Sequence, residues 1–124
     1  MKTSASQNVL NHLQAASILD LTFYEIGNAL WKESCLRKFL TKKESEILRN
    51  SFQTVLSKIN MIALETTSFQ GVFLISESEN LSFYDASYLF TAKEKGLVLV
   101  TEDKELKAKA KKYVEVQDIS SLSV

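Results

Sequence analysis

The chain has 124 residues, of which 45% are hydrophobic and 24% are charged, a balance typical of one soluble globular domain. Fifteen Lys and Arg residues balance fifteen Asp and Glu residues, so the formal net charge is zero. This balance argues against a strongly basic histone-like protein and against an acidic disordered tail, but a local basic face could still bind nucleic acid. The lone Cys35 excludes an internal disulfide and indicates a reducing, cytoplasmic compartment.

The chain shows no sign of a linker, an internal repeat or a membrane segment. It contains no proline and three glycines, so we expect residues 1–124 to form a single domain. Apolar runs such as Val72–Ile75 are too short to span a bilayer, and residues 1–6 lack the apolar core of a secretory signal. We therefore expect neither export nor association with a membrane.

In the first half of the chain, apolar spacing predicts a helix over residues 6–16 and a short strand near 17–20. Two Thr-x-x-Glu capping boxes, Thr22 with Glu25 and Thr41 with Glu44, predict the starts of two further helices. Aromatic side chains at helical spacing are expected in the core; they are Phe23, Trp31, Phe39, Phe52, Phe83 and Phe90. The second of these helices is expected to bury Leu48, Phe52, Val55, Leu56 and Ile59.

In the second half, strands are expected near residues 60–64, 97–101 and 113–116. The continuous apolar run Leu97–Val100 predicts a strand covered on both faces. Residues 68–79 suit a strand or a helix, Ser82 is expected to cap a following helix, and Gly96 suits a left-handed helix end. Short strands alternating with helices indicate an α/β fold with a mostly parallel sheet.

Three acidic residues follow predicted strands or begin predicted helices: Glu25, Asp85 and Asp103. In open α/β sheets, ligands bind beyond the carboxyl ends of the strands. Three carboxylates brought together would repel one another unless a cation neutralised them, and oxygen ligands without His or Cys favour Mg²⁺ or Mn²⁺. Acids in a first helical turn also serve simply as caps, so each of the three has a structural alternative. Glu102 is an alternative to Asp103 as the functional acid.

The sequence segments around these acids help to decide between metal-binding acids and helix caps. They read LTFYEIGNAL at residues 21–30, YDASYL at 84–89 and LVTED at 99–103. In order and in separation, with 60 residues from Glu25 to Asp85 and 18 from there to Asp103, they resemble the motifs of PIN domains. The resemblance covers residues 18–116 and is closest to the VapC-type toxins of toxin–antitoxin pairs.

The resemblance implies an α/β fold with a mostly parallel sheet flanked by helices, and a metal-dependent endoribonuclease acting on single-stranded RNA. It also implies that Glu25, Asp85 and Asp103 are catalytic acids that bind Mg²⁺ or Mn²⁺. Thr101 and Asn28 would then contact the substrate or support these acids. A small antitoxin protein and a second copy of the chain are the implied partners.

One departure from the family concerns the N-terminus. PIN domains begin with a central strand that ends in an Asp, and no such strand precedes residue 20; Lys2 stands where the acid would be. The sequence therefore predicts a domain that is shortened at its N-terminus, with open sheet edges and impaired cleavage. Two alternatives remain: a non-catalytic PIN-like binding or assembly module, and an unrelated α/β domain whose acids are helix caps.

For His12 and Cys35 a structural role is the expected one, and for the C-terminal lysines two interpretations remain open. His12 lies beside apolar positions of a predicted helix, and Cys35 is expected to be a small buried side chain. A run of lysines near the C-terminus suits a phosphate-facing stripe or a solvated helix face; it comprises Lys104, Lys107, Lys109, Lys111 and Lys112.

Overall fold

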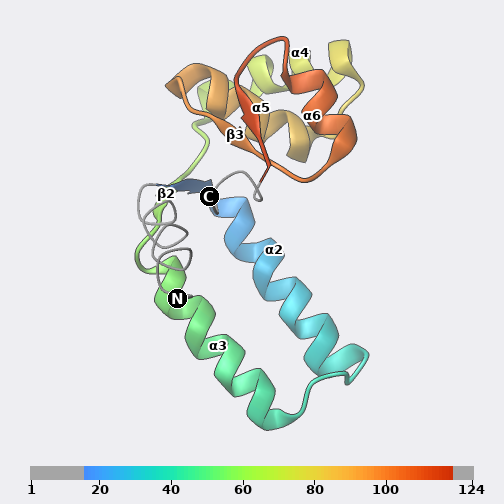
Figure 1. Ribbon diagram of the computed structural model, residues 1–124. Coiled ribbons are helices and arrows are strands. Elements are labelled where there is room, and N and C mark those ends of the chain that lie inside the picture. Colours follow the sequence, from blue (N-terminus) through green and yellow to red (C-terminus); the bar gives the residue numbers. More distant parts are fainter. Residues whose placement is uncertain (1–15, 119–124) are drawn as a thin grey trace, which may run out of the picture. The chain divides into compact units, whose positions relative to one another are not determined.

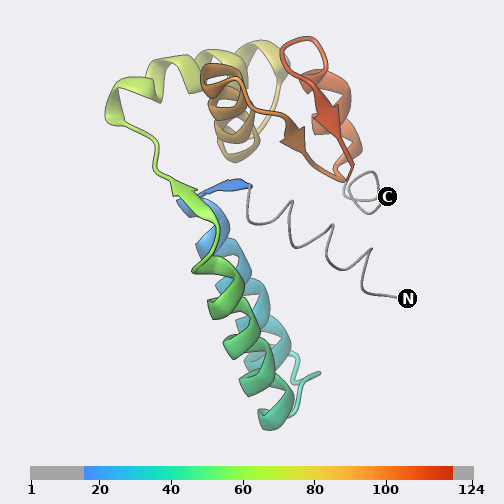
Figure 2. The same ribbon diagram turned by 60° about the vertical axis from the view of Figure 1, so that its left-hand side comes forward.

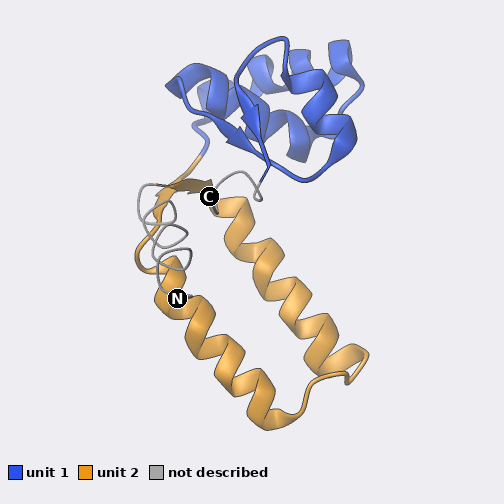
Figure 3. Cartoon of the chain, viewed as in Figure 1, with its two compact units in different colours: residues 1–8, 64–124 blue, residues 9–63 orange. Residues whose placement is uncertain are grey.

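The computed structural model describes residues 16–118 (Figure 1). The described chain folds into two compact units: unit 1 holds residues 64–118 and unit 2 holds residues 16–63 (Figure 3). The helix expected over residues 6–16 and His12 lie outside the described residues, Ala16 excepted. No helix within residues 16–118 is both long and apolar enough to cross a bilayer.

Unit 2 is a helical hairpin with both of its strands at one end (Figures 1 and 2). Strand β1 leads directly into helix α2, and helix α3 leads back to strand β2. A π-helical turn, η1, extends α2 at the opposite end. The elements are β1 (Ser17–Leu19), α2 (Asp20–Trp31), η1 (Lys32–Leu36), α3 (Lys42–Leu56) and β2 (Asn60–Ile62).

Unit 1 packs helices against a second pair of strands. Residues 69–79, which suited either a strand or a helix, form helix α4. The elements are the short 3-10 turn η2 (Thr66–Ser68), α4 (Phe69–Glu79), α5 (Phe83–Lys95), β3 (Leu99–Val100), α6 (Lys104–Ala110) and β4 (Val116–Gln117).

All four described strands lie in parallel pairs, which confirms the predicted α/β class. Strand β1 pairs with β2, with Ile18 opposite Met61, and β3 pairs with β4, with Leu99 opposite Val116. The expected strand positions are confirmed for the first three, while β4 begins three residues later than the start of the predicted range. No described strand joins the two pairs into one sheet.

The core of unit 1 connects α4, α5, β3 and α6. Val72, Ala86 and Leu89 are fully buried, and Leu99 and Leu106 join the same cluster from β3 and α6. Burial of this kind is the main stabilising contribution to a fold, at about 25 cal/mol per Å² of apolar surface. The predicted burial of the whole run Leu97–Val100 is wrong, because Leu99 alone is buried while its neighbours in the run are exposed. Among the described strands, β4 is the only one paired with β3.

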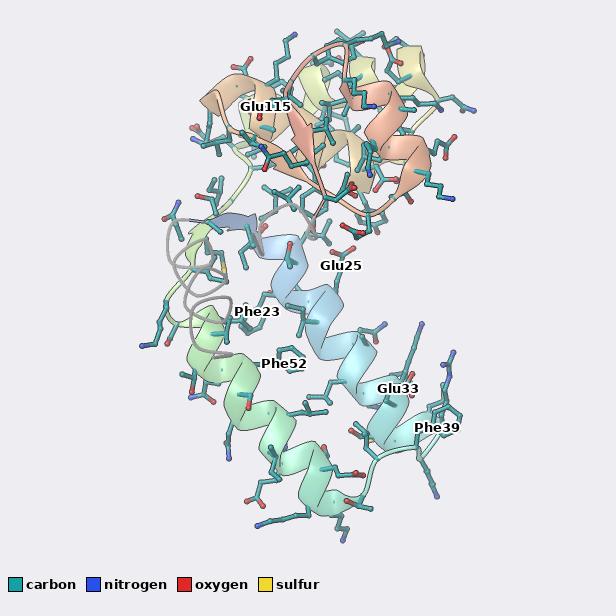
Figure 4. The ribbon with its side chains drawn as sticks, in the orientation of Figure 1. Phe23, Glu25, Glu33, Phe39, Phe52 and Glu115 are labelled. Atoms are coloured by element: carbon teal, nitrogen blue, oxygen red, sulfur yellow. The ribbon has the colours of Figure 1, made fainter. Side chains whose placement is uncertain are left out.

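Unit 2 shows the opposite pattern. Among residues 16–63, Leu19 is the only buried side chain, and neither α2 nor α3 contributes one. Phe23 and Phe52, which Figure 4 shows between the two helices, are 50% and 37% exposed. The expected burial of the α3 stripe and of the aromatic residues in this half is therefore wrong, whereas Phe83 and Phe90 pack against the core of unit 1. Helical spacing identifies an apolar face but not a neighbour that covers it.

The aromatic and cysteine predictions near the hairpin's far end fail in the same way. Trp31, Phe39 and Cys35 are all exposed. Trp31 is the last residue of α2, Cys35 lies on η1 and Phe39 lies on the connection to α3.

Two of the three predicted helix starts are confirmed. Thr41 accepts a hydrogen bond from the backbone N–H of Glu44, whose side chain accepts one from the N–H of Thr41. Ser82 accepts from the N–H of Asp85. The box at Thr22 is wrong, because α2 already begins at Asp20 with Leu19 as its N-cap. The helix starts earlier because β1 ends directly on it.

Candidate functional site

Asp103 lies just after β3 and begins α6. Its Oδ1 accepts a hydrogen bond of 2.8 Å from the backbone N–H of Leu106, while its own N–H donates to Oγ1 of Thr101 at 3.1 Å. The structural alternative is thus realised, because Asp103 is the N-cap of α6. A carboxylate can accept about four hydrogen bonds or metal contacts, so capping uses only part of this capacity.

Asp85 occupies the first turn of α5, as predicted, three residues after the cap Ser82. Gly96, with a φ of 64°, ends α5 in the left-handed conformation and reverses the chain into β3. Because Leu99 packs in the same core as Leu89, β3 runs back along α5.

The lengths of these two segments match. Asp85 precedes the end of α5 by about 15 Å of helix, and Asp103 follows the reversal by about 20 Å of extended chain. The topology therefore puts Asp85, Asp103 and Thr101 at the same end of unit 1, at the carboxyl end of β3. This is the position at which open α/β folds bind ligands.

Glu25 and Asn28 belong to unit 2. They lie three residues apart on α2 and therefore share one face of this helix, and both are exposed. Glu25 is in the second turn of α2, so the prediction that it begins a helix is wrong; Asp20 is the acid of the first turn. Because Glu25 belongs to unit 2 and the other two acids belong to unit 1, the three-acid site remains a prediction. Within either described unit, no three His, Cys, Asp or Glu residues form a group that could hold a metal ion.

The lysine run on and after α6 is largely engaged in ion pairs. Lys107 pairs with Asp118, and Lys109 pairs with Glu105 at 3.0 Å. Lys112 pairs with Glu79 at 2.7 Å. A continuous phosphate-facing stripe would need these charges unneutralised, so the structure favours a helix face tied to its own unit.

Glu79 is the centre of a polar contact that the sequence patterns did not reveal. It lies at the end of α4, and its carboxylate accepts hydrogen bonds from Lys112 Nζ and Tyr113 Oη although its side chain is only 9% exposed. These two bonds hold the pKa of Glu79 below its usual range. The same contact raises the pKa of Lys112 and of Tyr113. The partners are more than thirty residues apart, so no local pattern signals them.

Comparison with known proteins identifies the class to which this fold belongs. A family model for the PIN domain matches residues 2–112. The chain belongs to the PIN domain family, and its relatives are of the VapC type. Membership agrees with the parallel strand pairs and with the carboxyl-end position of Asp85 and Asp103.

A curated protein and a solved structure, both from Pyrobaculum aerophilum, illustrate the similarity. The chain is 40% identical over 110 residues to one named Exonuclease VapC9, covering 89% of this chain and 78% of that relative. It also resembles the crystal structure of PAE2754, with a TM-score of 0.78 and 35% identity, over 94% of this chain and 75% of that one.

Proposed function

We propose that this chain is a metal-dependent endoribonuclease that hydrolyses single-stranded RNA. Its site would consist of the acids Glu25, Asp85 and Asp103, with Thr101 and Asn28 as polar contacts to the substrate. What supports the proposal is that Asp85 lies in the first turn of α5 and that Asp103 follows β3 as the N-cap of α6, in a chain of the PIN family.

The donor set fits a hard divalent cation. The three acids offer only carboxylate oxygens, and Thr101 adds a hydroxyl, the ligand chemistry that Mg²⁺ and Mn²⁺ prefer. Bound there, such an ion would supply a water molecule of lowered pKa and neutralise charge on the scissile phosphate. Hydrolysis would form a P–O bond to the water oxygen, break the P–O bond to the leaving oxygen, and leave one proton of the water on that leaving oxygen.

The protein's own contribution is positional. The cap bond from Leu106 and the turn through Thr101 fix the carboxylate of Asp103 at the start of α6. Three acids hold an ion more loosely than a larger set, and a displacement of about 1 Å can cost on the order of 10²-fold in rate. We therefore expect weak cleavage, stronger with Mn²⁺ than with Mg²⁺ because Mn²⁺ generally binds such sites more tightly.

The same family membership suggests partners and location. We propose a small antitoxin protein that covers the acidic site, a homodimer, and action in the cytoplasm. Large apolar side chains exposed on α2 and α3 support a partner on unit 2, since exposed apolar patches often mark interaction sites.

The test is a cleavage assay on single-stranded RNA with titrated Mn²⁺ or Mg²⁺, comparing the parent with Asp85→Asn. We expect slow, metal-dependent cleavage by the parent and none by the variant. Glu94→Gln, an exposed position on the same helix, is the matched control and should cut like the parent. Equal cleavage by Asp85→Asn and its parent would refute the proposed site.

The mode of cleavage is tested separately, because one relative is named an exonuclease. A circular single-stranded RNA has no ends, so only an endonuclease can open it. Opening of the circle by the parent would support the endonuclease proposal, and degradation restricted to linear RNA would replace it with an exonuclease. Retained binding of a partner with no cleavage of either RNA would favour the non-catalytic module.

A further inference from the structure

The far end of the helical hairpin in unit 2 combines exposed apolar side chains with a concentration of positive charge. We call residues 31–43 the hairpin tip; they comprise the last residue of α2, all of η1, the connection and the first residues of α3. Phe39 and Leu36 are 71% and 62% exposed, and Figure 4 shows Phe39 at this outer end. The tip carries five cationic side chains and one acidic one, a formal net charge of +4 in a chain whose net charge is zero.

Some of these cations lie where the local structure disfavours them. Lys42 and Lys43 are the first two residues of α3, next to the positive end of the helix dipole, and the last turn of α3 holds no basic residue. The contact from Lys43 to Glu46, at 3.9 Å between exposed side chains, offsets little of this.

Lys38 shows the same conflict in its backbone. Its φ is 56°, the left-handed region that favours glycine or asparagine. Local folding therefore explains neither the choice of lysine at this position nor the two lysines at the start of α3. A polyanion bound at the tip would explain why these positions carry positive charge.

We propose that the hairpin tip binds the backbone and bases of single-stranded RNA, with its lysines on phosphates and Phe39 stacked on a base. Cationic side chains beside exposed aromatic rings are the combination by which proteins hold single strands without reading their sequence. This rests on the proposed function for its choice of polyanion. Glu25 lies about 16 Å along the same hairpin from Leu36, so the tip would form a contact separate from Glu25.

The test measures binding and stability together. A labelled single-stranded RNA is titrated with the full chain in EDTA, so that nothing is cut, at several salt concentrations. Phe39→Ala should weaken binding by about 5- to 150-fold. Replacing Lys42 and Lys43 with Gln should lower the slope of log affinity against log salt by about 1.4.

Stability distinguishes this from a structural role. The Lys42→Gln/Lys43→Gln variant and a Lys38→Gly variant should melt at the same temperature as the parent or higher, while both bind RNA less well. The matched control replaces the exposed lysines Lys58 and Lys95 with Gln, which removes the same charge elsewhere and should leave the affinity and the salt slope near those of the parent.

Several outcomes would overturn the proposal. One is equal loss of affinity in the control, which would mean that only the overall charge matters. Another is a changed oligomeric state of the tip variants in light scattering, which would make the tip a subunit interface. A third is binding to phosphatidylserine vesicles that RNA does not compete away. Cleavage is measured in a separate assay. Tip variants that bind and cut RNA like the parent would refute RNA binding at the tip but not the proposed nuclease activity. Binding that depends on the tip, in a chain that cuts no RNA, would refute the nuclease activity but not the binding site.

Discussion

Asp103 is predicted to have two roles, and two substitutions separate them. As N-cap of α6, it accepts a hydrogen bond from the N–H of Leu106, a residue whose side chain is buried in the core of unit 1. As a proposed acid of the site, it needs its negative charge. Asp103→Asn keeps an oxygen for the cap and removes the charge, whereas Asp103→Ala removes both.

The structure sets the expected magnitudes. Loss of a side-chain cap lowers the free energy of unfolding by about 1 kcal/mol, within a range of about 0.5–2 kcal/mol. Helix α6 has only seven residues, and a helix this short has little stability of its own. Asn caps about as well as Asp, so Asp103→Asn loses only the charge–dipole contribution, about 0.3–1 kcal/mol. A change of 1 kcal/mol corresponds to about 3–5 °C in Tm for a chain of this size.

Thermal unfolding and RNA cleavage are measured on the same preparations. We expect Asp103→Asn to melt within about 5 °C of the parent and Asp103→Ala to melt lower still. Both should lose cleavage by at least on the order of 10²-fold, since even outer-shell partners of a metal site contribute 10–100-fold. Glu102→Gln, at the adjacent exposed position, is the control and should cut normally.

Cleavage by Asp103→Asn at the parent's rate would show that Asp103 is a cap and nothing more. If Glu102→Gln were instead the inactive variant, the functional acid would be its neighbour. Either result would overturn the assignment of Asp103 without affecting the fold.

Two further predictions concern unit 1. Because its contacts lower the pKa of Glu79, they stabilise the fold fully above the unfolded value near 4.5 and are lost as pH falls through the lower folded value. Glu79→Gln should therefore lower Tm near neutral pH, and the Tm values of variant and parent should converge in acid. A Tm difference that stays constant across this pH range would contradict this prediction. So would an equal loss of Tm in Glu77→Gln, the control at an exposed position. A Cβ added at Gly71 would lie 2.5 Å from Cε2 of Phe90, so Gly71→Ala should destabilise by about 1 kcal/mol or more despite better helix propensity. Gly27→Ala, with nothing within 4 Å of the added atom, should raise Tm instead, and a stabilised Gly71→Ala would refute the packing argument.

Local patterns in the sequence determine much of what the structure shows. The capping box at Thr41, the cap at Ser82 and the left-handed Gly96 depend on neighbours within a few residues, and all three are confirmed. The strand positions and the family could also be predicted from short sequence segments. Apolar runs indicate strands, and the order and spacing of motifs indicate a family, and both can be read directly from the sequence. Asp103 as a helix cap was one of the two alternatives that the sequence left open.

Only the tertiary structure decided what covers each element. Helical spacing marked Phe23 and Phe52 as apolar-face residues but could not show that both stay exposed, because burial depends on a partner surface distant in sequence. The start of α2 at Asp20, against the pattern at Thr22, follows from the strand that precedes it. The contact of Glu79 with Lys112 and Tyr113 joins residues more than thirty positions apart, and only the tertiary structure brings the end of α4 within hydrogen-bond distance of the turn that follows α6.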